Sequence, residues 1–238
     1  MSDNVNRQKK IIGFIEEQIK ELLEIILGLK TSDRKSTLQL ALSSARCYCG
    51  YEAGKPYNSV SFTVRQNCVE LIKAGISPFR NSDEGDLFLS LFLYLNCLEQ
   101  IGNLFCPVIE SDKNGIVRAI KKFAPDELDE DEINILAGLR HALAHSFGLV
   151  NLSLSGKPKH KYQLSLEDSD RIIRKEITPW SGDYSEKSEG TSVIAYVFSI
   201  IRLSERIFNE LLYDYNRGRL NLILGDEEVK SCFTIIYD

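Results

Sequence analysis

The sequence predicts a mainly α fold: an antiparallel helical bundle with a small β-hairpin insertion and short C-terminal strands. Apolar residues recur at three- and four-residue steps through most of the chain, which is the period of amphipathic helices. A period of two appears only after residue 149. The chain has 238 residues, 43% hydrophobic and 26% charged, which suits one core. We therefore expect a single domain, residues 1–238, with a hairpin appendage at about 149–167.

The first half of the chain predicts helices in sequence. Residues 8–30 carry isoleucine and leucine along one face of a helix. A second helix, capped by Ser36 or by the threonine after it, is expected to reach about Tyr51. Residues 58–74 form a weaker helical candidate with a β-branched start. Residues 86–106 are the most apolar segment and too long for a strand, so they predict the central buried helix.

Two further helices and a hairpin are expected next. A short helix is predicted at about 113–123. A longer one runs from about Asp129 to Phe147, after an acidic run that suits a helix N-terminus, and Gly148 is a natural C-terminal cap. Apolar and polar residues then alternate in 150–155 and 162–167, which predicts two strands joined by a loop.

The C-terminal part of the chain predicts one more long helix. Residues 168–190 are mostly polar and indicate a largely irregular segment. A helix is expected from about Thr191 to Asn216, where apolar residues again recur at helical spacing. Short strand-like pieces follow near 220–224 and 232–237.

Charge and apolarity exclude some classes of protein. The net charge of -5 argues against broad, non-specific attraction to nucleic acid, so any RNA contact has to be local. The longest nearly apolar stretch, Leu87 to Leu98, is too short to cross a bilayer. The first residues lack the apolar region of a signal peptide. We expect a cytoplasmic protein with no membrane partner.

One polar stripe marks the helix at 129–147. Asn134, Gly138, His141 and His145 are separated by steps of four, three and four, which places them within a sector of about 60 degrees. Gly138 costs roughly 1 kcal/mol of helix stability relative to alanine, a cost that close approach can explain. The approaching group is a ligand phosphate, a neighbouring helix, the same helix of a second subunit, or packing within one chain.

Arg140 lies on the apolar face of the same helix, about 20 degrees from Ile133. A guanidinium there must find a carboxylate, a set of carbonyl groups or a bound anion, because burying it unpaired is prohibitive. The two readings are an anion-binding residue and a structural ion pair.

His141 and His145 point the same way, which suits a shared metal ion or acid–base work. Ala142 stands where the zinc-protease pattern HExxH requires glutamate, and a third ligand is not evident. A zinc site is therefore only a third hypothesis, and we expect neither metal nor cofactor. His145 lies in the last turn, where the helix dipole stabilises an imidazolium, which favours proton transfer.

The segment Arg140-His141-Ala142-Leu143-Ala144-His145 resembles the R-x4-6-H motif of HEPN domains (higher eukaryotes and prokaryotes nucleotide-binding). The resemblance implies a helical bundle that pairs as a dimer and acts as a metal-independent endoribonuclease in toxin–antitoxin or defence systems, with an antitoxin as a further partner. It also implies that Arg140 and His145 are the catalytic pair and that His141 replaces the polar residue after the arginine. The alternative is a non-catalytic HEPN-like module that binds nucleic acid, nucleotide or protein.

The spacing within the motif points to a site shared by two copies. Arg140 and His145 are about 140 degrees apart on an ideal helix, so one copy does not bring both to one phosphate. A homodimer paired through this helix would do so, with Asn134 and Gly138 contacting the RNA. The loop between the predicted strands adds Lys157, Lys159 and Lys161 as candidate RNA contacts, although such charges also serve solubility.

Overall fold

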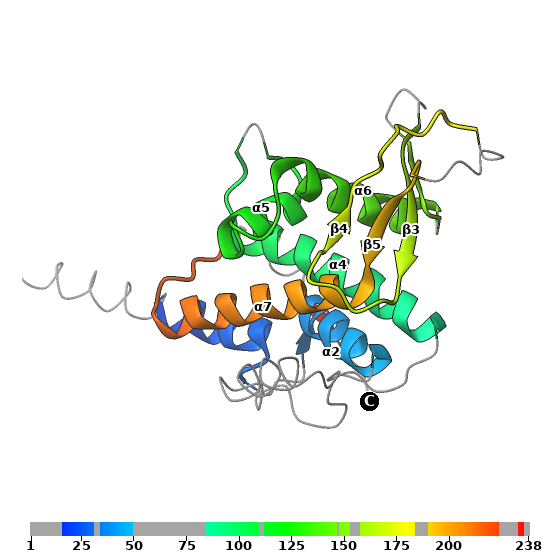
Figure 1. Ribbon diagram of the computed structural model, residues 1–238. Coiled ribbons are helices and arrows are strands. Elements are labelled where there is room, and N and C mark those ends of the chain that lie inside the picture. Colours follow the sequence, from blue (N-terminus) through cyan, green and yellow to red (C-terminus); the bar gives the residue numbers. More distant parts are fainter. Residues whose placement is uncertain are drawn as a thin grey trace, which may run out of the picture.

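The computed structural model describes residues 16–30, 34–49, 84–109, 112–146, 148–152, 158–183, 190–223 and 233–235. Within these ranges the chain is mainly helical, with a small mixed sheet of four short strands (Figure 1). Residues 16–27 are helical, and the further helices are α2 (Thr37–Cys49), α4 (Glu84–Phe105), α5 (Gly115–Phe123), α6 (Glu130–Ser146) and α7 (Val197–Asn216). The strands are β1 (Arg34–Ser36), β2 (Val150–Leu152), β3 (Pro158–Ser165), β4 (Ile173–Arg174), β5 (Val193–Tyr196) and β6 (Phe233–Ile235).

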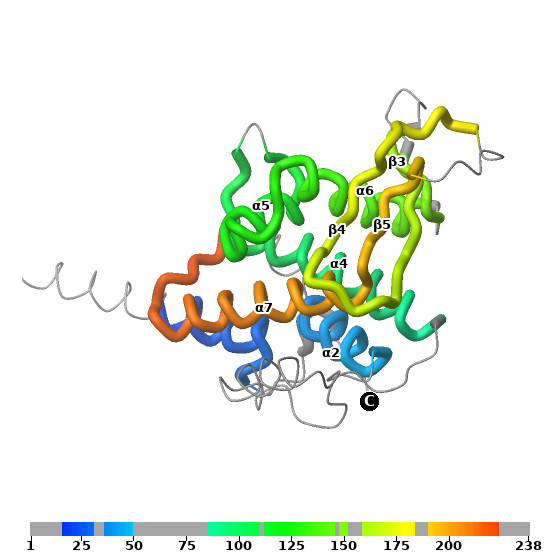
Figure 2. Tube along the Cα trace, viewed as in Figure 1, coloured from blue at the N-terminus to red at the C-terminus, as the bar shows by residue number. Residues whose placement is uncertain are grey.

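Helix α4 is the central buried helix that the sequence predicts. It contacts α2, α5, α6 and α7, and Figure 2 shows α5 and α6 above it and α2 below. Leu91, Tyr94, Leu95 and Leu98 are fully buried along it. The helix is longer than the apolar stretch noted in the sequence: its Gly85–Phe105 part could cross a membrane by length and composition alone. Of its apolar window, 56% is buried within the chain.

A buried ionic network joins three of the helices. Arg46 of α2 donates from Nε and Nη2 to the two carboxylate oxygens of Glu205 on α7, at 2.7 and 2.6 Å. The hydroxyl of Tyr94 on α4 donates to the same carboxylate at 2.5 Å. Burial and the charge of Glu205 raise the pKa of Tyr94 well above its usual value. Because breaking a buried pair strands a charge, this network fixes how α2, α4 and α7 meet.

The predicted hairpin is confirmed, but it is half of a larger sheet. Strands β2 and β3 pair antiparallel, with Val150 opposite Lys161 and Asn151 opposite His160. Strand β3 then pairs parallel with β5, and β5 pairs antiparallel with β4, so the order is β2-β3-β5-β4. The sequence predicted the two strands of the hairpin but not β4 and β5, which extend it into a four-stranded sheet. The sheet stands beside α6, which contacts both β2 and β3 (Figure 1).

Helix α7 begins six residues later than the sequence predicts. The prediction of helix from Thr191 was wrong because residues 193–196 form β5. Val193 and Ile194 are β-branched, and β3 offers an edge with which they pair. The buried apolar residues of β5 are followed directly by those of α7, so the sequence shows one continuous apolar pattern across the strand and the helix. Strand β4 also lies inside the segment expected to be largely irregular.

A second, two-stranded sheet joins β1, which follows the first helix, to β6 near the end of the chain. Strand β6 confirms the strand expected near 232–237, and it pairs antiparallel with β1, which the sequence did not predict. The piece near 220–224 is not a strand over residues 220–223. The helix expected at 8–30 is confirmed over 16–27, whereas the candidate at 58–74 lies outside the described residues.

Candidate functional site

Helix α6 starts from a reciprocal cap that fixes its orientation. The Asp129 carboxylate accepts from the backbone N–H of Glu132 at 2.9 Å, and the Glu132 carboxylate accepts from the backbone N–H of Asp129 at 3.0 Å. Lys175, just after β4, donates to both oxygens of Asp129 and lowers the pKa of that carboxyl. The start of α6 is thereby tied to the sheet, and the histidines lie at its other end.

His141 and His145 form an exposed pair of imidazoles on α6. Their ring centroids are 4.4 Å apart and their planes are inclined by 49°. This confirms that the two side chains share one face of the helix, as their spacing predicts. Both rings are open to solvent, so a ligand or a second protein molecule can reach them without rearrangement of the chain.

Arg140 turns away from the imidazoles toward α4. Its Nη2 is in an ion pair with the carboxylate of Glu99 and donates to the side-chain oxygen of Asn96 at 3.3 Å. The side chains of Arg140 and Glu99 are each 21% exposed, so the pair lies at the margin of the core. This is the ion pair that the sequence left as one of two readings. Nε of Arg140 is buried and has no acceptor among the described residues, so the guanidinium is incompletely satisfied.

Gly138 is a packing glycine within the chain. A β-carbon at this position would lie 2.6 Å from Nδ2 of Asn151 on β2 and 2.6 Å from the hydroxyl of Tyr162 on β3. That hydroxyl donates to the carbonyl of Ile135 at 2.9 Å. Of the groups that could approach Gly138, the structure places the hairpin of the same chain there, so a phosphate or a second α6 does not occupy that space.

The polar stripe of α6 is therefore divided by the sheet. Asn134, predicted as a substrate contact, is exposed, and its amide donates back to the carbonyl of Glu130 at 2.8 Å. Gly138 is covered, while His141 and His145 are open. The accessible part of the stripe toward the end of α6 is the imidazole pair.

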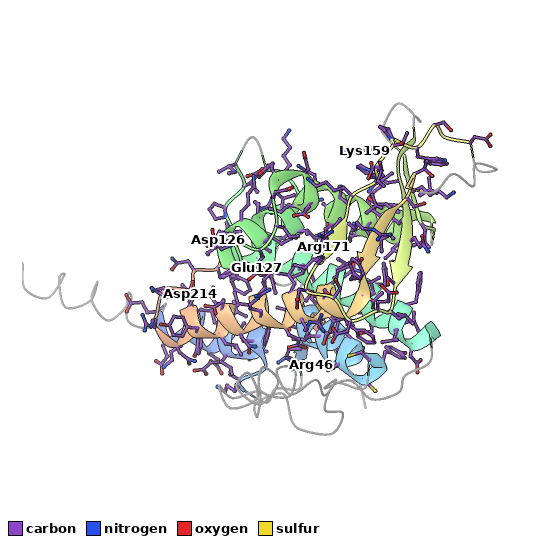
Figure 3. All side chains as sticks on the ribbon, viewed as in Figure 1. Arg46, Asp126, Glu127, Lys159, Arg171 and Asp214 are labelled. Atoms are coloured by element: carbon purple, nitrogen blue, oxygen red, sulfur yellow. The ribbon has the colours of Figure 1, made fainter. Side chains whose placement is uncertain are left out.

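The structure describes two of the three lysines predicted as RNA contacts in the basic loop. Lys157 lies outside the described residues. Lys159 is exposed at the outer end of β3 (Figure 3). Lys161 precedes Tyr162, whose side chain faces α6, and successive strand residues point to opposite faces. A contact between Lys161 and RNA bound at the imidazoles would thus come from the far face of the sheet.

Several residues around α6 were not found by sequence reasoning. They are Asn96 and Glu99 on α4, Asn151 on β2, and the pair formed by His160 and Glu176. Glu99 is one of 34 acidic residues and carries no local mark that separates it from the others. Asn151 and Tyr162 could have been predicted as neighbours of Gly138. Both have polar side-chain ends and lie in the strands expected just after the helix that carries the glycine.

The imidazole pair does not line the cavity found at the other end of α6. That cavity, of about 470 Å³, is lined by Glu127, Leu128, Glu132, Asp170, Arg171, Ile172, Ile173, Arg174 and Lys175. Figure 3 labels Glu127 and Arg171, two of the lining residues, with Arg171 beside β4. In the described ranges no group of three or more histidine, cysteine, aspartate or glutamate side chains is placed to hold a metal ion.

The geometry offers two imidazoles for proton transfer and a nearby guanidinium held by a carboxylate. On one copy of the chain these groups point to different sides of α6, toward solvent and toward α4. Comparisons of the chain with protein-family models, with curated proteins and with solved structures found no match.

Proposed function

We propose that this chain is a HEPN-type, metal-independent endoribonuclease that cleaves single-stranded RNA at a site shared by two copies. The observation that carries the proposal is the exposed imidazole pair of His141 and His145, 4.4 Å between centroids, on the helix that also bears Arg140. Two adjacent histidines that are exposed to solvent are suited to general acid–base catalysis, and neither imidazole has a desolvation cost to offset. We also propose that the helices form the antiparallel bundle that the sequence predicts.

The chemistry requires only groups that this chain supplies. His145 takes the proton of a ribose 2′-OH, the 2′-oxygen attacks the adjacent phosphorus, and the bond from phosphorus to the 5′-oxygen breaks. His141, protonated beforehand, gives its proton to the leaving 5′-oxygen. The products are a 2′,3′-cyclic phosphate and a 5′-hydroxyl. Arg140 stabilises the negative charge that develops on the phosphorane-like transition state.

A second copy explains how Arg140 would meet the imidazoles. Within one chain its contacts lie toward α4, on the side away from the open face of the histidines. In the proposed dimer, Arg140 of one copy leaves Glu99 and reaches His145 of the other copy across a two-fold axis. The side chains of Arg140 and Glu99 are each 21% exposed, so the guanidinium can exchange this carboxylate for a phosphate at the margin of the core. A toxin or defence role, with an antitoxin as partner, follows from the resemblance.

The second candidate is a non-catalytic HEPN-like module. The ion pair between Arg140 and Glu99 favours it, because an arginine committed to a structural carboxylate is not free to stabilise a transition state. In that case the imidazole pair would serve only to bind an anionic partner.

RNA cleavage in EDTA tests the proposal. The full chain and the variants His145→Ala, His141→Ala and Lys113→Gln are incubated with single-stranded RNA, and the product ends are analysed. Lys113 is exposed and lies far from α6 in sequence, so its variant is the control. We expect cleavage to survive EDTA, to fall at least about 100-fold in His145→Ala, and to persist in the control. Equal inertness of wild type and His145→Ala would favour the binding module.

A further inference from the structure

The third histidine of the chain is held by a carboxylate. His160 on β3 donates from Nδ1 to Oε1 of Glu176, 3.0 Å away, and the two side chains are 14% and 15% exposed. The other carboxylate oxygen of Glu176 is buried and has no partner among the residues that the structure describes. An unpaired buried acceptor costs free energy, so this oxygen can still take a hydrogen bond from a ligand or a water molecule.

The strand register places His160 on the sheet face that covers α6. It lies directly opposite Asn151 on β2, and opposite residues in an antiparallel pair share a face. It is also two residues before Tyr162, which gives the same face, and the two rings are 6.0 Å apart. Asn151 and Tyr162 are the side chains nearest Gly138 on α6. Gly138 is one helical turn from His141.

The hydrogen bond to Glu176 determines what His160 can do. A carboxylate that holds Nδ1 fixes the tautomer and the ring orientation, and it leaves Nε2 as the nitrogen that meets a ligand. Among the described residues, no hydrogen bond or ion pair of Nε2 is found. Carboxylate-held imidazoles of this kind bind or position ligands in many protein sites.

We propose that His160, oriented by Glu176, is a third histidine of the RNA site and hydrogen-bonds through Nε2 to the sugar–phosphate backbone of the strand bound at His141 and His145. The inference rests on the proposed function, since it extends the same site from α6 onto β3. His160 binds the strand and is not one of the two proton-transfer groups. Its neighbour Tyr162 holds the sheet against α6 and thereby fixes the distance between His160 and the imidazole pair.

Nuclear magnetic resonance of the histidine rings tests the inference directly. The chain has three histidines, so selective ring labelling gives three signals. The wild-type protein is titrated with a single-stranded RNA whose 2′-hydroxyls are methylated, which cannot be cleaved by 2′-OH attack, and separately with inorganic phosphate. We expect the signal of His160 to shift together with those of His141 and His145 when the RNA binds. A His160 signal unchanged at saturating RNA would overturn the inference.

The behaviour of the other two signals separates this inference from the proposed function. Shifts of His141 and His145 without His160 leave the α6 site standing and remove His160 from it. The absence of all three shifts overturns both. A shift of His160 with RNA but not with phosphate assigns the contact to the strand and not to a simple anion.

Variants give a second, independent measurement of affinity for the methylated RNA. His160→Gln is expected to weaken binding about tenfold, the scale of one hydrogen bond to a charged group. Glu176→Gln keeps an acceptor for Nδ1 and should rescue most of the affinity that Glu176→Ala loses. Gln163→Ala, on the exposed face of the same strand, is the matched control and should bind as wild type does. Equal affinity of His160→Gln and the control, with both folded by circular dichroism, would refute the contact.

Discussion

The ion pair between Arg140 and Glu99 makes the sharpest prediction, because it separates a structural arginine from a catalytic one. Both side chains are 21% exposed, between the fully exposed and the fully buried case. Exposed pairs contribute under about 1 kcal/mol, and breaking a buried pair costs about 3–5 kcal/mol. We therefore expect Arg140→Ala to lower the free energy of unfolding by about 1–2 kcal/mol, or Tm by roughly 2–8 °C for a chain of this size.

The assay is a double-mutant cycle read by chemical denaturation and by RNA cleavage. Arg140→Ala, Glu99→Gln and the double variant are compared with wild type, and the coupling free energy is expected to be about 1 kcal/mol. Cleavage should fall at least about 100-fold in Arg140→Ala, whereas Glu99→Gln should retain most activity because it keeps the guanidinium and removes only the carboxylate that competes with phosphate. A loss of stability above about 4 kcal/mol with unchanged cleavage in Arg140→Ala would refute the reasoning and make the arginine purely structural.

Three further predictions concern the scaffold of the site. Gly138→Ala should lower the free energy of unfolding by about 1 kcal/mol, since overpacking against the hairpin outweighs the gain in helix propensity; a more stable variant in urea denaturation would contradict the packing. Glu205→Ala should cost about 3–5 kcal/mol because it removes the carboxylate that faces the buried guanidinium of Arg46, whereas Tyr94→Phe should cost only about 1 kcal/mol, both measured by guanidinium denaturation; equal losses from the two variants would contradict this ranking of the ion pair above the hydrogen bond. Lys175→Met should raise the pKa of Asp129 toward its usual value in a carbon-13 titration. Lys175 lowers the pKa of Asp129 in the folded protein. The contact therefore stabilises the fold at pH values above the pKa of Asp129 in the unfolded chain, and this stabilisation is lost as the pH falls through the folded-state pKa. An unchanged pKa of Asp129 in Lys175→Met would exclude the ion pair in solution.

Helices were the part of the fold most open to prediction from the sequence. The long apolar run of α4 and the polar stripe of α6 are local patterns, and both helices lie within a few residues of their expected bounds. The strands depended on partners far away in the chain. Strand β5 forms because β3 offers it an edge, and the β-branched Val193 and Ile194 alone did not separate that outcome from a first helical turn.

The site was predictable as far as a single helix determines it. The spacing of His141 and His145 fixes their common face, and their proximity was confirmed. The position of Arg140 on the apolar face implied a partner, but the identity of Glu99 required the packing of α4 against α6. The sequence also left open which group approaches Gly138. That group belongs to the hairpin, which follows α6 in the chain and packs back against it.

The central claim is that Arg140 of one copy and His145 of another act on one phosphate. The most direct measurement mixes the purified variants Arg140→Ala and His145→Ala, each inactive alone, and follows RNA cleavage in EDTA after subunit exchange. Random exchange makes half of the dimers mixed, each with one intact site of two, so recovery of about a quarter of wild-type activity is predicted. A mixture as inactive as its two components would contradict the shared site.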